Sequence, residues 1–288
     1  MASLIPRRFF NPATEGDTVT TLDYVARVGY LAKGLVYGLV GILAGKAAFE
    51  VGNSPPGKED AFQTIIEAPF GRVILGVTAV GLLCYVAWRV MQVVLDPGGK
   101  GNGWKGWAIR LGFAVSGLFY LVMSVQAGWF AWRGSVPDAG DAAEGVTGSE
   151  KATGLMLGVP FGWIPVMIAG AIFVGVGLHH FYRSWSAKFM KDYEHTEMSQ
   201  VERRIVRPVG VLGLAARGFT FSLIGLFLMR AGWRQNSGEV KGLEGSFEAL
   251  MAYSWGWIAL LILAIGFVLY GLYCFSRAKY RRFVEGEV

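Results

Sequence analysis

The pattern of apolar and polar residues along the chain predicts six membrane-spanning helices. Six runs are almost wholly apolar, and they lack the period-two alternation that is typical of barrel strands. Each run is long enough for a helix of roughly 20 residues, which crosses a hydrocarbon core of about 30 Å. The runs cover residues 25–49, 70–95, 107–132, 157–180, 209–233 and 253–277. We therefore predict an all-α membrane protein with six transmembrane helices.

The first, third and fifth runs are copies of one another. Residues 27–48 align without a gap with residues 110–131 and with residues 211–232. The alignment places small residues at fixed offsets in three apolar segments, which indicates an internal triplication. A unit of two helices returns to the side of the membrane where it began, so all three units share one orientation. We therefore expect a pseudo-threefold axis along the membrane normal.

The triplication divides the chain into a short tail and three repeats of two transmembrane helices each. The predicted ranges are 1–22 for a cytoplasmic N-terminal tail, 23–103 for repeat 1, 104–202 for repeat 2, and 203–288 for repeat 3 with a basic C-terminal tail. The first 22 residues contain no apolar stretch followed by a small-residue cleavage site. We therefore expect the first helix itself to direct insertion into the membrane.

Small residues lie on one face of each first helix. In repeat 1 they recur at spacings of four and three, which places them on a single helix face. The residues are Gly34, Gly38 and Gly41 in repeat 1, Gly117 and Ser124 in repeat 2, and Gly218 and Gly225 in repeat 3. In lipid, such a face lets another backbone approach closely. We predict that the three first helices pack against one another and form the core.

The charged residues set the orientation that we expect. Only 17% of the residues are charged, against about a quarter in soluble domains. Most of the 27 Lys and Arg residues fall on the side that holds both termini and the loops 96–106 and 183–208, which predicts that this side is cytoplasmic. The net charge of +6 then reflects this asymmetry and an attraction to anionic lipid, and not a surface for nucleic acid.

The second helix of each repeat ends in aromatic residues followed by arginine. Residues 177–183 align with residues 271–277 without a gap, and residues 85–89 are a looser copy. An aromatic ring suits the depth of the lipid headgroups, and a guanidinium reaches their phosphates. We therefore expect Arg89, Arg183 and Arg277 to lie at equivalent positions on the cytoplasmic interface.

These features together resemble a known bacterial family. Repeat 1 opens with R-x-G-x-x-A-x-G and Y-G-x-x-G, a P-F-G entry stands at residues 69–71 and 160–162, and a basic stretch covers residues 277–282. Over about residues 23–283, the sequence looks like the membrane-protein family called domain of unknown function 1206. It departs from the pattern at Ser116 and at the proline missing before residues 255–256. The resemblance implies a six-helix protein of the bacterial inner membrane and implies no activity.

Catalytic and metal-binding motifs do not occur in the sequence. It has no Gly-rich phosphate loop, HExxH or GxSxG, and its acidic outer loops lack the spacing of a calcium loop. His179 and His180 point about 100° apart on a helix, so they do not share a ligand site. His195 follows in a charged loop, and Cys84 and Cys274 form no CxxC pair. We therefore expect no metal, no cofactor and no enzymatic activity.

Two basic residues inside the apolar runs are the candidate functional residues. Lys33 and Arg217 occupy the same repeat position, and Ser116 stands there in repeat 2. A charge near the membrane centre costs about 2.5–3.5 kcal/mol even on the gentlest scale, so it needs a partner. The simpler alternative is that both side chains snorkel to nearby cytoplasmic phosphates. We predict that Lys33 and Arg217 bind a lipid phosphate, an anionic ligand or exposed carbonyls, with Ser116 completing the ring.

Two functions from different classes are compatible with these observations. The glycine-rich helices and the lack of catalytic groups favour a structural or accessory membrane component that binds lipid or a partner membrane protein. The alternative is a transporter or channel for ions or small solutes along the pseudo-threefold axis, because repeats and glycine-rich helices are common in transporters. The apolar mid-span positions argue against this alternative. A membrane-embedded enzyme would need a buried cluster of His or carboxylate groups.

Overall fold

The computed structural model describes residues 12–49, 66–67, 70–95, 103–135, 148–193 and 198–280, and the regular elements there are helices. The six long helices are α1 (Pro12–Phe49), α3 (Gly71–Val94), α4 (Trp104–Arg133), α6 (Trp163–Ser186), α7 (Gln200–Arg234) and α9 (Gly256–Tyr280). Each contains a segment long and apolar enough to cross a membrane, which in α1 is Asp23–Phe49. The chain is therefore an all-α integral membrane protein, as its sequence predicts.

Short helices lie between the long ones in the part of the chain that the structure describes. They include α5 (Gly148–Leu157), α8 (Leu243–Met251) and the 3-10 helices η2 (Lys188–Asp192) and η3 (Ser237–Glu239). Helix α8 packs on α9 through the buried side chains of Phe247 and Leu250. This contact holds the connection between α7 and α9 against the helix that follows it.

Two long helices begin earlier than the apolar runs. Helix α1 begins at Pro12, so its first turns lie in the range that the sequence assigned to a tail. Proline fits the first turn because its missing N–H would have no partner there. Helix α7 begins at Gln200, where Ser199 and Glu202 form a capping box. Polar turns carry no apolar signal, and therefore the hydropathy pattern predicted both starts too late.

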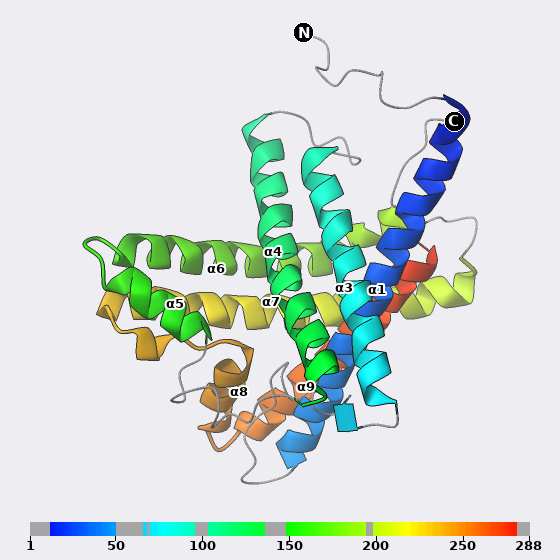
Figure 1. Ribbon diagram of the computed structural model, residues 1–288. Coiled ribbons are helices and arrows are strands. Elements are labelled where there is room, and N and C mark those ends of the chain that lie inside the picture. The colour runs from blue at the N-terminus through cyan, green and yellow to red at the C-terminus, as the bar shows by residue number, and fades with distance from the viewer. Residues whose placement is uncertain are drawn as a thin grey trace.

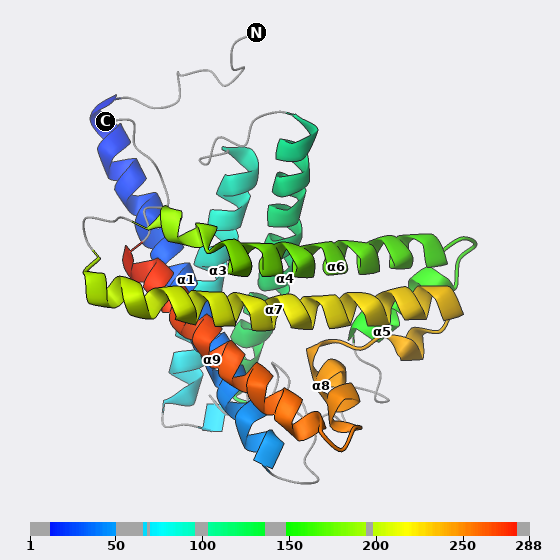
Figure 2. The ribbon, with the colours of Figure 1, turned by 180° about the vertical axis from the view of Figure 1, so that it is seen from behind.

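The six long helices pair across the boundaries between repeats. Helix α1 packs along α9, α3 along α4, and α6 along α7 (Figures 1 and 2). Helices α4 and α7 thus each lie beside the second helix of the preceding repeat, and α1 lies beside α9, the second helix of repeat 3. Within repeats, α1 packs on α3 and α7 on α9, whereas α4 and α6 are not among the extensively packed pairs of the described helices. Helices α6 and α7 run steeply across α3 and α4 (Figure 1).

The glycine faces of the first helices contact these partners from other repeats. A Cβ built on Gly41 would lie 2.7 Å from backbone atoms of Ala264 and Val268 on α9. A Cβ built on Gly225 would lie 2.7 Å from the backbone of Gly170 on α6. Small residues let two helix backbones approach closely in lipid. The prediction that the three first helices pack against one another is therefore wrong, because each glycine face fits a second helix instead.

The other predicted small residues make the same kind of contact, with one exception. The remaining contacts join Gly34 to Phe275, Gly218 to Gly177, Gly117 to Arg89, and Ser124 to Ala79. Gly38 differs, because a Cβ built there would have no described atom within 4 Å. The stripe is therefore a packing surface at every predicted position; at Gly38 the backbone faces Gly271 on α9, and only the direction of its own Cβ is open.

Contacts within repeats 1 and 3 fix the structural alignment of the second helices. A Cβ built on Gly29 would lie 2.6 Å from the backbone of Tyr85, and a Cβ built on Gly213 would lie 2.6 Å from the backbone of Tyr270. Gly29 and Gly213 are aligned repeat positions, so Tyr85 and Tyr270 are equivalent residues. The sequence alignment matched Arg89 with Arg277 and so placed Tyr85 over Tyr273. For repeat 1 this alignment is therefore wrong by nearly one helical turn.

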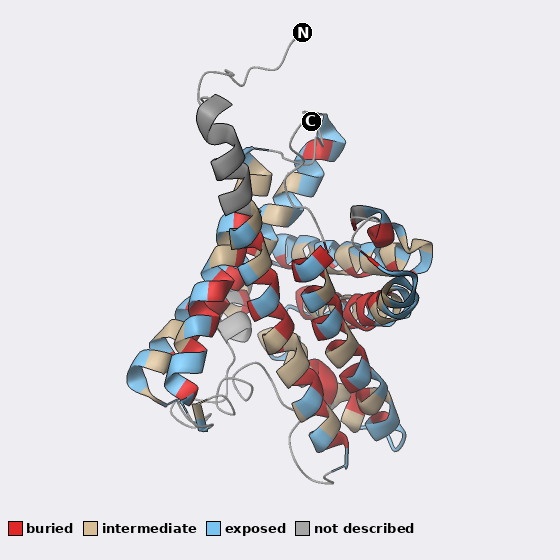
Figure 3. Ribbon diagram, turned by 90° about the vertical axis from the view of Figure 1, so that its right-hand side faces the viewer, coloured by how far each residue is buried: buried red, intermediate tan, exposed pale blue. Residues whose placement is uncertain are grey.

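Burial is uneven among the six long helices (Figure 3). The apolar spans of α1 and α9 contain the largest shares of buried residues, and those of α4 and α6 the smallest. Helices α4 and α6 are also the two helices of repeat 2 that do not pack extensively on each other. Repeat 2 therefore turns most of its apolar surface outward, as expected of helices that face lipid.

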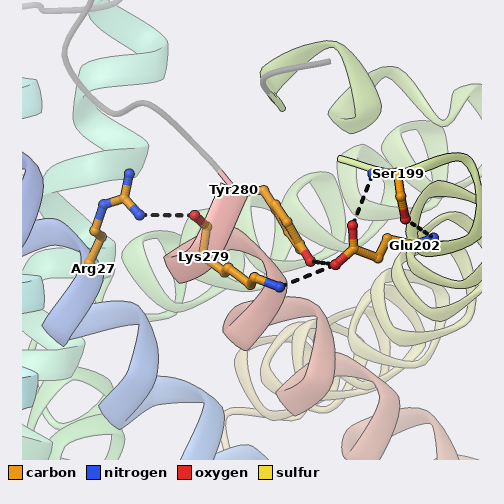
Figure 4. A network of polar contacts seen from close by, with 5 residues as sticks. All are labelled: Arg27, Ser199, Glu202, Lys279 and Tyr280. Atoms are coloured by element: carbon orange, nitrogen blue, oxygen red, sulfur yellow. Dashed lines mark hydrogen bonds and ion pairs between the residues drawn. The ribbon is translucent and has the colours of Figure 1, made fainter. Parts of the chain in front are cut away.

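A polar network ties together α1, α7 and α9 at the end of α9 (Figure 4). Arg27 donates to the carbonyls of Ala278 and Lys279, both at 2.9 Å. Glu202 accepts from Lys279 Nζ at 3.2 Å and from the hydroxyl of Tyr280. The last carbonyls of a helix lack partners within the helix, and an arginine satisfies them. The network therefore joins the start of α7 and the middle of α1 to the end of α9.

The substitution Ser199→Ala is expected to lower the free energy of unfolding by about 1 kcal/mol, the usual effect of losing a helix cap. The Ser199 hydroxyl accepts from the N–H of Glu202 at 3.2 Å, and alanine leaves that N–H without its acceptor. Ser199→Thr is the matched control, because threonine also forms a capping box. Thermal unfolding in detergent micelles measures both variants. Equal losses in the two variants would contradict a capping role.

Candidate functional site

Lys33 projects from α1 into the protein and not toward its surface. The residue is only 2% exposed. Its Nζ donates to the hydroxyl of Tyr85 on α3 at 3.0 Å, and it lies 4.5 Å from the centroid of that ring and 4.9 Å from the ring centroid of Tyr120 on α4. Aromatic faces attract a cation through the quadrupole of the ring. Snorkelling therefore does not describe Lys33, because its ammonium stays inside the helix assembly.

Arg217 on α7 has the same kind of surroundings. The residue is 7% exposed, and its Nη1 donates to the hydroxyl of Tyr270 on α9. Its Cζ lies 4.8 Å from the ring centroid of Tyr270 and 5.1 Å from that of Tyr37 on α1. The Nζ of Lys33 lies 5.5 Å from the same Tyr270 ring. The structure therefore brings the two aligned cations onto one shared tyrosine.

The tyrosines around these cations contact one another. The hydroxyl of Tyr120 donates to that of Tyr37 at 3.2 Å, which links α4 to α1. The rings of Tyr85 and Tyr120 meet edge to face with centroids 4.7 Å apart, and those of Tyr37 and Tyr270 with centroids 4.8 Å apart. Such pairs add to the stability of a buried contact. Side chains from four helices thus form one aromatic lining around the two charges.

Two further arginines border this lining. Arg89 donates from Nη2 to the hydroxyl of Tyr85. Arg277 is only 4% exposed, donates from Nη1 to the hydroxyl of Tyr273 at 2.9 Å, and places its Cζ 5.0 Å from the ring centroid of Tyr30. The sequence predicted that Arg277 lies at an exposed interface. The structure shows instead that Arg277 is buried. We call the following residues the cation–tyrosine cluster: Lys33, Arg89, Arg217, Arg277, Tyr30, Tyr37, Tyr85, Tyr120, Tyr270 and Tyr273.

The predicted equivalence of the three helix-end arginines fails in repeat 1. Arg89 follows Tyr85 by one turn, as Cys274 follows Tyr270. The structural counterpart of Arg89 is therefore Cys274. Arg183 is half-buried in the last turn of α6. Arg89 and Arg277 both belong to the cation–tyrosine cluster. Arg183 lies outside that cluster and has the partial exposure expected at an interface.

The cation–tyrosine cluster holds more positive charge than the described residues neutralise. Among those residues, no carboxylate pairs with Lys33, Arg89 or Arg217. A buried cation without an anion loses several kcal/mol of hydration, which tyrosine hydroxyls and ring faces offset only in part. The Nε atoms of Arg89 and Arg217 are buried and have no hydrogen-bond partner in the described part of the chain. The arrangement can therefore accept an anion.

Comparison with known proteins identifies the family. The family model described as Domain of Unknown Function (DUF1206) matches residues 28–96, 111–187 and 212–281. This chain belongs to the DUF1206 family. The three DUF1206 segments cover most of α1 with α3, of α4 with α6, and of α7 with α9. The predicted resemblance and the three repeats are therefore confirmed.

A relative of the DUF1206 chain comes from Bacillus subtilis (strain 168). This protein, described as uncharacterized protein YxxB, is 31% identical over 265 residues, which are 92% of this chain and 93% of that protein. No solved structure matches the chain. The relative therefore extends over all six long helices and all three DUF1206 repeats, and it places the chain among bacterial multi-pass membrane proteins.

The second DUF1206 repeat supplies no cation to the cluster. Ser116 aligns with Lys33 and Arg217, but it is half-buried and makes no hydrogen bond within the described residues. Helix α4 contributes Tyr120 instead. The structure thus brings together two of the three aligned residues and leaves Ser116 apart. The binding of a lipid phosphate by these residues stays a prediction.

Sequence analysis of the DUF1206 repeats missed the tyrosines. Tyr85 and Tyr270 are equivalent, but the alignment on helix-end arginines placed Tyr85 over Tyr273. Gly81 and Gly266 carry the correct signal, because a Cβ on either would overlap an alanine side chain of the first helix. An alignment on these two glycines would have shown that each aligned cation has a tyrosine on the neighbouring helix.

The described histidines and cysteines of the DUF1206 chain are His179, His180, Cys84 and Cys274. No group of three or more His, Cys, Asp or Glu residues that could hold a metal occurs in the residues that the structure describes. His180 stacks on Phe221 with ring centroids 5.7 Å apart. Cys84 and Cys274 are free thiols, and His195 lies outside the described residues.

Proposed function

We propose that this protein is a non-enzymatic structural or accessory component of the bacterial inner membrane that binds anionic phospholipid, with both termini on the cytoplasmic side. The observation that carries the proposal is the cation–tyrosine cluster, whose Lys33, Arg89 and Arg217 have no carboxylate partner among the described residues. A phosphate supplies the missing negative charge and offers the oxygen geometry that guanidinium groups recognise. The excess of Lys and Arg on the side of the termini supports the orientation.

A lipid is the anion most available at the depth of the cluster. Lys33 and Arg217 lie within candidate membrane spans, Asp23–Phe49 and Gln200–Arg234. Phospholipid surrounds such segments at high local concentration, and positive side chains attract its anionic headgroups. A partner membrane protein would have to bring a carboxylate to a buried place. We therefore favour lipid as the ligand and treat a bound partner protein as a separate outcome of the test below.

Binding accounts for the centre of the assembly better than transport does. The rings of Tyr37 and Tyr270 pack edge to face, and the hydroxyl of Tyr120 bonds to that of Tyr37. A solute moving along the proposed pseudo-threefold axis would have to displace these rings. Cations held by aromatic side chains suit a resident ligand, because each contact is satisfied only in one arrangement.

The full-length protein purified in a mild detergent is expected to retain anionic phospholipid. Native mass spectrometry identifies the bound lipid and its amount. The double variant Lys33→Ala with Arg217→Ala should retain about a tenth as much or less. Losing a hydrogen bond to a charged group costs about 1.5–3 kcal/mol, and about 1.4 kcal/mol is a tenfold change in affinity.

The matched control removes the same charge elsewhere. Arg230→Ala with Arg234→Ala acts near the other end of α7, where both arginines pair with Glu239 at the surface. This control should retain as much lipid as the parent protein. The proposal fails if the parent carries no anionic lipid or if the two double variants retain equal amounts. A co-purifying membrane protein without lipid would point to the partner alternative, and solute flux in vesicles would point to transport.

A further inference from the structure

Repeat 2 differs from the other repeats at the contact between its two helices. In repeats 1 and 3, a Cβ built on Gly29 or Gly213 would lie 2.6 Å from the backbone of the second helix. A Cβ built on the aligned Gly112 would have no described atom within 4 Å. The two helices of repeat 2 are therefore apart at the level where the other two repeats are closed.

The tyrosine that fills this place in the other repeats is absent from repeat 2. Gly177 and Gly271 are equivalent, because a Cβ on either would lie 2.7 Å from the carbonyl oxygen of an aligned glycine on its partner helix. Val176 precedes Gly177 as Tyr270 precedes Gly271, so Val176 is the counterpart of Tyr270. A valine side chain is too short to reach across to α4, and it carries no hydroxyl.

Two other exchanges separate the helices further. Gly266, whose Cβ position overlaps the Ala216 side chain, corresponds to Ile172 on α6. Ile172 is exposed, because its side chain prevents the close approach that glycine allows. Ser116 replaces the cation on α4. Repeat 2 thus lacks the cation, the tyrosine and the glycine that close repeats 1 and 3.

Unused hydrogen-bond donors lie on α7 and α6 beside this opening. Arg217 is more than nine-tenths buried, yet its Nε has no hydrogen-bond partner in the described chain. The Nδ1 of His180 on α6 is also buried and has no partner there. Both side chains contact one ring, since the Cζ of Arg217 lies 4.9 Å from the ring centroid of Phe221 and His180 stacks on that ring. Buried hydrogen-bonding nitrogens without a partner are rare in proteins, and the oxygens of one phosphate would satisfy both of these.

We infer that the phosphate group of an anionic phospholipid enters from the bilayer between α4 and α6 and binds Arg217 in the sector that lacks a tyrosine. His180 supplies a further nitrogen from α6, one of the two helices that flank the opening. The inference rests on the proposed function and specifies its site and its route of entry. The site takes a phosphate anion, and free inorganic phosphate carries the same chemistry.

The surroundings of the opening favour a lipid over free phosphate. Val115 on α4 and Ile172 on α6 are both exposed apolar residues, so acyl chains can lie against them while the headgroup reaches inward. A free phosphate ion would have to cross the same apolar surface without any such contact. The inner wall is cationic and the outer wall is apolar, which is the amphipathic pattern of a phospholipid.

Val176→Tyr tests the site without changing any charge. The new tyrosine restores the residue found at the equivalent positions of repeats 1 and 3, so it should occupy the opening and accept from the free donor of Arg217. Retention of anionic lipid by the full-length protein is expected to fall about tenfold, as for the loss of one charged hydrogen bond. Val176→Leu is the matched control, because leucine leaves the opening without a hydroxyl and should retain lipid like the parent.

A second variant keeps the test decisive if the tyrosine disturbs folding. His180→Ala removes the imidazole nitrogens together with the ring that stacks on Phe221, and it leaves the backbone contacts between α6 and α7 in place. Its retention of anionic lipid should fall several-fold. The matched control is His179→Ala, which removes the exposed neighbour of His180. Size-exclusion chromatography shows whether each variant is folded.

Titration of lipid-stripped protein separates the two sources of phosphate. Phosphatidylglycerol, phosphatidylcholine and inorganic phosphate are added to separate samples in detergent micelles, and the melting temperature is followed. Phosphatidylglycerol alone should raise it, and Val176→Tyr should remove that increase. An increase with inorganic phosphate alone would overturn the lipid assignment.

Two further outcomes distinguish the site from the proposed function. If the parent retains anionic lipid but Val176→Tyr and His180→Ala retain just as much, the site between α4 and α6 is wrong and the proposed function stands. If the parent neither retains nor responds to anionic lipid, both are wrong.

Discussion

Gly41→Ala is expected to lower the free energy of unfolding by about 1–3 kcal/mol, the usual effect of overpacking, whereas Gly38→Ala on the same helix should leave it nearly unchanged. A Cβ on Gly41 would lie 2.7 Å from backbone atoms of Ala264 and Val268. Because these atoms belong to the backbone of α9, the two helices must separate to admit the methyl group. A Cβ on Gly38 meets no described atom within 4 Å.

The stability of Gly41→Ala and of Gly38→Ala is measured by thermal and by denaturant unfolding in the same detergent. Gly225→Ala extends the test to repeat 3, because a Cβ on Gly225 would lie 2.7 Å from the carbonyl oxygen of Gly170. Its loss of stability should be similar to that of Gly41→Ala, since the two contacts are equivalent. A loss in Gly38→Ala as large as in Gly41→Ala would show that α1 does not pack on α9 as described.

Tyr270→Phe is expected to lower the free energy of unfolding by about 1–3 kcal/mol, because it leaves a buried charged donor without its acceptor. The hydroxyl of Tyr270 accepts from Nη1 of Arg217, whose Nε already lacks a partner among the described residues. The ring remains, so the cation–π contacts and the packing persist. The loss therefore isolates the hydrogen bond from the aromatic contact.

Tyr253→Phe is the matched control for this change. Tyr253 lies between α8 and α9 and is 59% exposed, so losing its hydroxyl should have no measurable effect. Thermal unfolding of lipid-stripped protein measures both variants. If anionic lipid restores the stability of Tyr270→Phe, the ligand has taken over the role of the hydroxyl. If lipid-stripped Tyr270→Phe is as stable as the lipid-stripped parent protein, the bond between Tyr270 and Arg217 has no structural role.

The sequence predicts the helices and the repeats because both signals are local or periodic. Hydropathy locates the six spans, and the fixed offset between copies places Lys33 on Arg217. The polar first turns of α1 and α7 were missed for the same reason, since Pro12 and Ser199 begin helices that have no apolar signal there. The sequence shows residues that can cap a helix, such as Ser199 and Glu202. Such residues indicate a helix start only where a helix is already expected.

The partners of the glycine faces could not be read from the sequence. A small-residue stripe shows that some backbone approaches closely and does not show which one. Gly41 and Gly225 therefore suggested contacts among the first helices, whereas they fit Ala264 and Gly170 on second helices. Which helix packs on a glycine face depends on how all the helices are arranged in space. One stripe of small residues does not determine that arrangement.

The depth and partners of the two cations could not be predicted either. Lys33 and Arg217 lie about two helical turns inside their apolar runs, where a side chain that snorkels and one that is buried have the same sequence signature. Burial follows from tyrosines on α3 and α9 that reach over the cations, and these positions require the alignment of Tyr85 with Tyr270. That alignment depends on a contact between helices and not on residue identity alone.

Because α1 packs on α9, the order in which the helices are made differs from the order in which their contacts form. Helix α1 precedes the other long helices that the structure describes, and its glycine face fits α9, the last of those six. During synthesis that face has only lipid or insertion factors to contact, and such unfinished surfaces favour misassembly. Arg27 on α1 likewise contacts the carbonyls of Ala278 and Lys279 only after α9 has been made. Docking of α9 therefore completes the contacts of α1 late in assembly and joins α1, α3 and α4 to α7 and α6.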